Sequence, residues 1–123
     1  MAKKKVSDRA TNKMLQNWYN IFNSRFFEGR LPPDIEVRFA RTEDDKDQLG
    51  SDCMGCYIKS LKLILVDARL DGYWKVLQSN MLHEMAHVRW PDHISHKHIA
   101  DHGMMFQREL VRLFEAGAYD GLL

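Results

Sequence analysis

The histidines carry the clearest chemical signal in this sequence, because all six lie between His83 and His102. The first two belong to the segment His83-Glu84-Met85-Ala86-His87, which has the spacing H-E-x-x-H. In a helix, residues four apart lie on one face, about 6 Å apart along the axis. Two imidazoles at that spacing can bind one metal ion, and a glutamate beside the first can reach a metal-bound water. The pattern predicts a zinc site with His83 and His87 as ligands and Glu84 as the general base.

The segment around the motif is predicted to be a helix that presents both histidines on one side. On a helical wheel, the histidines fall at about 200° and 240° from Met81, whereas an apolar stripe spans about ±40° around it. The stripe consists of residues at offsets of three or four: Trp74, Leu77, Met81, Met85 and Val88. A helix capped by Asp71 and running to about Trp90 would bury this stripe and point the histidines into a cleft.

Catalytic zinc usually has three protein ligands, and spacing leaves three candidates for the third. His93 follows His87 by six residues, as in metzincins, but Trp90 and Pro91 occupy the turn where that pattern needs a glycine. Glu109 in the following helix would give a gluzincin-type site. His102 precedes the last amphipathic segment, and spacing alone ranks it narrowly first.

Two elements together resemble the SprT-like (Spartan-type) metalloprotease domain. They are the H-E-x-x-H of residues 83–87 and, after a loop of fourteen residues, His102-Gly103-x-x-Phe106. The likeness extends from about Leu15 to Phe114 and includes Gly29-Arg30-Leu31-Pro32 and the expected strands. The resemblance implies that His102 completes a site for one Zn²⁺ with His83 and His87. It also implies a zincin-like fold and the hydrolysis of peptide bonds.

The chain is predicted to form one α+β domain in which a small three-stranded antiparallel sheet packs on helices. Residues 1–10 are interpreted as a basic, flexible tail containing Lys3 to Lys5, and residues 11–123 as the single SprT-like domain. The first helix should run from about Ser7 to Gly29 and be followed by Pro32 and Pro33. Its aromatic stripe is interpreted as core and consists of Leu15, Trp18, Phe22 and Phe26, with Tyr19 and Phe27 beside it.

Strands are predicted at residues 34–41, 53–59 and 61–66, and the second is our candidate for the edge that holds an extended substrate. The acidic segment 41–52 is interpreted as a solvated loop. A histidine-rich loop at residues 91–101 precedes a final helix from about Gly103 to Glu115. The residues expected to be buried in this helix are Phe106, Leu110, Leu113 and Phe114.

Composition narrows the classes of function. A net charge of +1 gives no general attraction to nucleic acid, and no apolar stretch approaches the roughly 20 residues of a membrane span. No apolar segment follows the N-terminal lysines, so we expect no secretory signal and a cytoplasmic location. Cys53 and Cys56 are too few for the four-cysteine zinc ribbon of many SprT-like proteins. We interpret them as strand residues, with a redox pair or a metal site shared with another molecule as the alternative.

The predicted function is that of a zinc-dependent endopeptidase acting on a protein or peptide substrate, with Glu84 as proton acceptor. The resemblance adds DNA-associated or DNA-crosslinked proteins as substrates. The residue that stabilises the transition state is left open among the loop residues His93, His96 and His98 and the tyrosines Tyr57, Tyr73 and Tyr119. The alternative function is a zinc-stabilised, non-catalytic binding or regulatory module. Glu84 argues against it, because a purely structural site has no use for an adjacent base.

Overall fold

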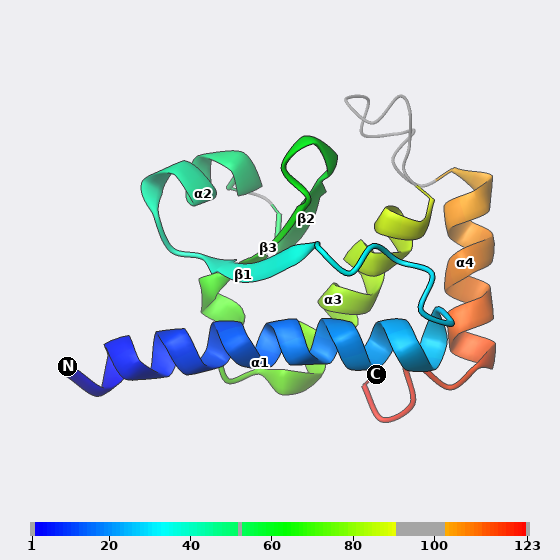
Figure 1. The fold of residues 1–123 in the computed structure, drawn as a ribbon, viewed down its shortest axis with the longest axis horizontal. Coiled ribbons are helices and arrows are strands. Elements are labelled where there is room, and N and C mark those ends of the chain that lie inside the picture. Colours follow the sequence, from blue (N-terminus) through cyan, green and yellow to red (C-terminus); the bar gives the residue numbers. More distant parts are fainter. Residues whose placement is uncertain (1, 52, 91–102, 123) are drawn as a thin grey trace.

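The computed structural model describes residues 2–51, 53–90 and 103–122, with side chains from residue 12 onward. These residues form an α+β domain (Figure 1). Its elements are α1 (Ala2–Phe26), β1 (Glu36–Ala40), α2 (Glu43–Leu49), β2 (Gly55–Ile58), the 3₁₀ turn η1 (Lys59–Leu61), β3 (Leu63–Asp67), the 3₁₀ turn η2 (Ala68–Leu70), α3 (Trp74–Arg89) and α4 (Met104–Glu115). No helix in this part of the chain combines the length and the apolar character that crossing a membrane requires.

The sheet is mixed, and the prediction of an antiparallel sheet was wrong. Its strand order is β1-β3-β2, with β1 parallel and β2 antiparallel to β3. The central position of β3 follows from its burial, because its first four residues are all 4% exposed or less. A strand with such a continuous apolar run needs neighbours on both edges and cover on both faces. The chain therefore passes through α2 to the far edge, and β3 then returns into the centre.

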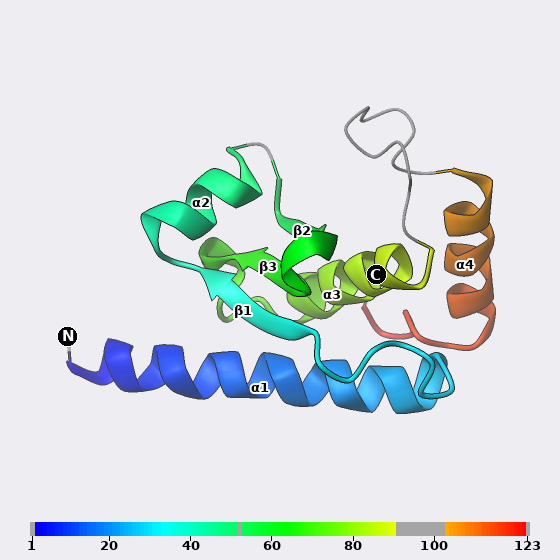
Figure 2. The same cartoon turned by 45° about the horizontal axis from the view of Figure 1, so that its top comes forward.

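Helices cover both faces of the sheet (Figure 2). One face carries Val37, Phe39, Ile64 and Val66 and packs against α1 and α3 in the main core. The other face carries Ala40, Leu63 and Leu65 and packs against Leu49 of α2 in a smaller cluster. Because strand side chains alternate between the two faces, the sheet separates two cores. Helix α3, which contains the H-E-x-x-H motif, packs in the larger core.

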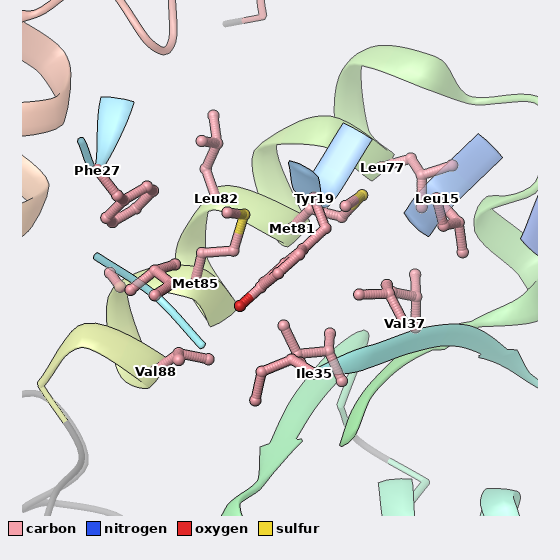
Figure 3. Packing of buried hydrophobic residues seen from close by; sticks show 14 of the residues in the cluster. Leu15, Tyr19, Phe27, Ile35, Val37, Leu77, Met81, Leu82, Met85 and Val88 are labelled. Carbon is pink, nitrogen blue, oxygen red and sulfur yellow. The ribbon is translucent and has the colours of Figure 1, made fainter. Parts of the chain in front are cut away.

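The apolar stripe of α3 is buried as predicted. Leu77, Met81 and Met85 have no exposed surface, and Val88 is 7% exposed, whereas Trp74 at the start of the helix is 45% exposed. Figure 3 shows Leu77, Met81, Met85 and Val88 packed near Leu15 and Tyr19 of α1, Ile35 just before β1, and Val37 of β1. Leu82, Glu84 and Ala86 are buried as well, so α3 is enclosed on more than one side, and His83 and His87 are the partly buried positions of the motif.

Side chains of α1 cover the outer edge of β1. The Gln16 amide donates to the Ile35 carbonyl at 2.9 Å and accepts from the Val37 N–H at 3.0 Å. Asn12 accepts from the Phe39 N–H at 3.0 Å. These amides satisfy backbone groups that a neighbouring strand would otherwise pair. At the opposite end of the strand order, β2 is the edge strand.

Residues 43–49 form helix α2, so the prediction of a loop over residues 41–52 was wrong there. Thr42 is the N-cap, and its hydroxyl accepts from the Asp45 N–H at 3.0 Å. The first turn contains three acidic residues, which favour the positive end of the helix dipole. A hydrogen-bonded ion pair with Arg38 at 2.8 Å holds the pKa of the Asp45 carboxyl below its usual value.

Two predicted details of the other helices also need correction. Asp71 does not cap α3, because the helix begins at Trp74 and Asp71 forms an ion pair with Arg41 at 3.1 Å. Phe114 of α4 is 48% exposed and stacks on Tyr119 with ring centroids 4.4 Å apart, although burial was predicted. At the N-terminal end, α1 begins at Ala2, before the predicted start at Ser7.

Candidate metal centre

His83 and His87 lie together on α3 with their ring centroids 5.1 Å apart. Two imidazoles that bind one tetrahedral zinc through Zn–N bonds of about 2.0–2.1 Å would have centroids about 5 Å apart. Both histidines are partly buried. The observed separation therefore fits a pair of ligands to a single metal ion.

Phe106 of α4 forms an aromatic wall against both histidines. Its ring stacks on His87 at a centroid distance of 4.1 Å and an interplanar angle of 19°. The same ring meets His83 nearly edge-on at 5.0 Å. Because Phe106 is itself only 3% exposed, the core holds the ring in place, and the ring in turn limits the orientations of the two imidazoles.

Glu84 is 6% exposed and lies where α3 passes under β2. The approach is close at Gly55, since a Cβ on this glycine would lie 2.3 Å from Asn80 Oδ1 and 3.4 Å from Glu84 Cγ. The lack of a side chain at Gly55 thus allows the edge strand to approach the carboxylate of the motif.

We expect Gly55→Ala to destabilise the fold by about 0.5–1.5 kcal/mol, because the new methyl group would push the end of the Asn80 side chain away from its rotamer. Chemical denaturation of the purified variant measures this loss. The matched control is Gly55→Ala combined with Asn80→Ala, which removes the overlapping atoms. The double variant should be more stable than the sum of the two single changes allows, whereas simple additivity would show that Asn80 is not the obstacle.

Glu109, the alternative third ligand, is occupied elsewhere. Its carboxylate accepts from Arg112 Nη2 at 2.5 Å and from Trp90 Nε1 at 3.3 Å, and its side chain is buried. Arg112 also donates to the Phe26 carbonyl at 2.6 Å. The carboxylate therefore joins α4 to the ends of α3 and α1. Within the described parts of the chain, no three His, Cys, Asp or Glu side chains are grouped so that they could hold a metal ion.

The remaining histidines lie outside the described residues. These are the predicted third ligand His102, the metzincin alternative His93, and His96 and His98 of the predicted loop. The described part of the site thus consists of the two predicted ligands His83 and His87 and of Glu84, with Phe106 and Gly55 around them. The sequence indicated the first three through their spacing, but it gave no sign of the close approach at Gly55.

The three tyrosines weighed as transition-state stabilisers lie in different places. Tyr73 is 66% exposed just before α3, and Tyr57 is half-buried near Asp34 and Lys62. Tyr119 is buried, and burial followed by the charge of Glu84 raises its pKa to about 12. Its hydroxyl therefore stays protonated at neutral pH. Tyr119 is therefore a core residue, although the charge of Glu84 contributes to its raised pKa.

The two cysteines are free thiols, with Cys53 exposed and Cys56 half-buried in β2. Burial first, then the charge of Glu84, raises the pKa of the Cys56 thiol to about 12. A thiol with that pKa remains protonated at neutral pH and is a poor nucleophile. Cys56 also packs against the smaller core of Leu49 and Leu65, which agrees with its interpretation as a strand residue. Cys53 precedes β2, so the same interpretation was wrong for Cys53.

The chain matches no family model, no curated protein and no solved structure. The resemblance to SprT-like domains therefore depends on the residues and spacings of the sequence.

Proposed function

We propose that this protein is a zinc-dependent endopeptidase of the SprT-like type. The observation that carries the proposal is the pair of imidazoles with centroids 5.1 Å apart on one face of α3, with Glu84 next to the first. His83 and His87 would hold the zinc together with His102. When bound, zinc supplies a Lewis acid that polarises a carbonyl and lowers the pKa of water from about 15.7 toward 7.

Glu84 is the proposed general base. It is adjacent to His83 and therefore about 100° around the helix from it, beside the ligand pair but outside it. Its carboxylate would take a proton from the attacking water and deliver it to the amine that leaves. Burial of Glu84 under β2 limits its access to bulk water and fixes its position relative to a substrate on that strand.

β2 is the proposed substrate-binding edge. It ends the strand order β1-β3-β2, and its residue Gly55 lies against α3 at Glu84. An extended peptide added to this edge would be held by main-chain hydrogen bonds, which read little of its sequence. The edge of β1 is less suited to this role because amides of α1 already bond it. The substrate class is therefore protein or peptide, with selectivity set mainly by access to the cleft.

DNA-associated or DNA-crosslinked proteins are included among the proposed substrates because of the family resemblance. A net charge of +1 supports this only weakly, since nucleic acid affinity is largely carried by excess cationic side chains. We therefore propose peptide hydrolysis as the activity, and the assay compares cleavage with and without DNA.

The test is cleavage of casein, and of the protein itself, with and without single-stranded DNA. We expect cleavage that stops when a chelator removes the metal and returns when zinc is added. Stimulation by single-stranded DNA would identify DNA as an activator. A zinc-loaded protein that cleaves nothing under either condition would contradict the proposal and favour the non-catalytic module.

A further inference from the structure

The hydroxyl of Ser79 is buried and forms no hydrogen bond with the described residues. Its Oγ is inaccessible to solvent and has no hydrogen-bond partner among the residues that the structure describes. A helical serine would ordinarily satisfy itself on the carbonyl four residues earlier, here that of Lys75, but this bond is not formed. Leaving a buried hydroxyl unpaired costs folding free energy, so its presence in α3 calls for a partner.

The position of Ser79 indicates which partner that is. It stands four residues before His83, on the same face of α3. Helical side chains lean toward the N-terminus, so the His83 imidazole extends back over the turn that contains Ser79. Their Cβ atoms should be about 5–6 Å apart, which is close enough for a seryl oxygen to reach an imidazole nitrogen. The hydroxyl is thus placed beside the first predicted ligand.

We propose that Ser79 is a positioning residue of the metal site. Its hydroxyl would accept a hydrogen bond from one ring N–H of His83, which would leave the other ring nitrogen to hold the zinc. Metal-binding histidines generally donate their second ring N–H to such a partner, which fixes the tautomer and the ring orientation. Phe106 restrains the ring from the side of α4, and Ser79 would restrain it from the preceding helical turn. This inference rests on the proposed function.

The experiment is to measure both zinc affinity and metal-free stability in Ser79→Ala. We expect zinc affinity to fall about 10–100-fold, as is typical when a ligand's outer partner is lost. The melting temperature of the metal-free protein should not fall, because the change removes an unpaired buried hydroxyl. Ser79→Thr keeps a hydroxyl and should retain more of the zinc affinity than Ser79→Ala. The matched control is Ser24→Ala, an exposed serine in α1 that gains the same helix propensity.

The outcomes separate this inference from the proposed function. Unchanged zinc affinity in Ser79→Ala, with zinc still lost when His83 and His87 are replaced, would overturn the role of Ser79 and leave the metal site intact. A lower metal-free melting temperature, or failure to fold, would show that the hydroxyl makes a structural bond, which also overturns the inference. If the wild-type protein binds no zinc through the histidines, it is the proposed function that fails.

Discussion

Glu84→Gln is expected to keep zinc bound and to lower peptidase activity by a factor of about 10² or more. Glutamine has nearly the same shape as glutamate and can still form hydrogen bonds, but it cannot accept the proton of the attacking water. Because Glu84 is adjacent to His83 and is proposed as a base and not a ligand, metal binding should be preserved. Single-turnover cleavage of casein by zinc-saturated protein, together with the zinc content of the same sample, measures both quantities.

The control for this change is Glu109→Gln. Both glutamates are 6% exposed, so each variant places an amide in a buried site. Glu109→Gln should lower the melting temperature, because Arg112 and Trp90 lose their anionic partner, but it should retain zinc and most of the activity of the folded protein. Full activity in Glu84→Gln would assign the base to another residue. Loss of zinc in Glu84→Gln would instead indicate that this carboxylate binds the metal.

His102→Ala is expected to lower zinc affinity by more than the 10–100-fold that loss of an outer partner costs, because it removes a direct ligand. His93→Ala should keep the affinity nearly unchanged, since the turn before His93 lacks the glycine of the metzincin pattern. Competition with a chromophoric chelator measures the affinity of each variant. The zinc affinity of Glu109→Gln tests Glu109, the remaining candidate for the third ligand. Weaker binding in His93→Ala or Glu109→Gln, with normal binding in His102→Ala, would show that our third ligand is wrong.

Helical periodicity allowed the positions of α3 and α4 to be predicted closely. The stripe Leu77, Met81 and Met85 is fully buried, which leaves His83 and His87 on another side of the helix, as the wheel requires. A pattern of period 3.6 specifies which face of a helix is buried. The direction of the histidines could therefore be inferred before the fold was known.

The order of the strands was harder to predict because it depends on contacts between distant segments. The run from Leu63 to Val66 is apolar without alternation, and that is the mark of a strand buried on both faces. The prediction of an antiparallel sheet did not take this signal into account. The helix at residues 43–49 was missed for a local reason, since its start resembles a solvated acidic loop unless Thr42 is recognised as a cap.

Within the site, spacing predicted the residues but not their surroundings. The stacking of Phe106 on His87 and the approach of Gly55 to Glu84 both join segments far apart in the chain. The pairing of Glu109 with Arg112 and Trp90 similarly arises from the packing of three helices. Such contacts follow from tertiary structure, and a single sequence contains no periodic signal for them.

The zinc content of the purified protein tests the central claim most directly. Elemental analysis of the wild-type chain should give about one zinc per molecule, and the double variant His83→Ala, His87→Ala should give essentially none. A wild-type protein free of zinc after purification and zinc addition would contradict the account. The same conclusion would follow if the double variant kept its zinc.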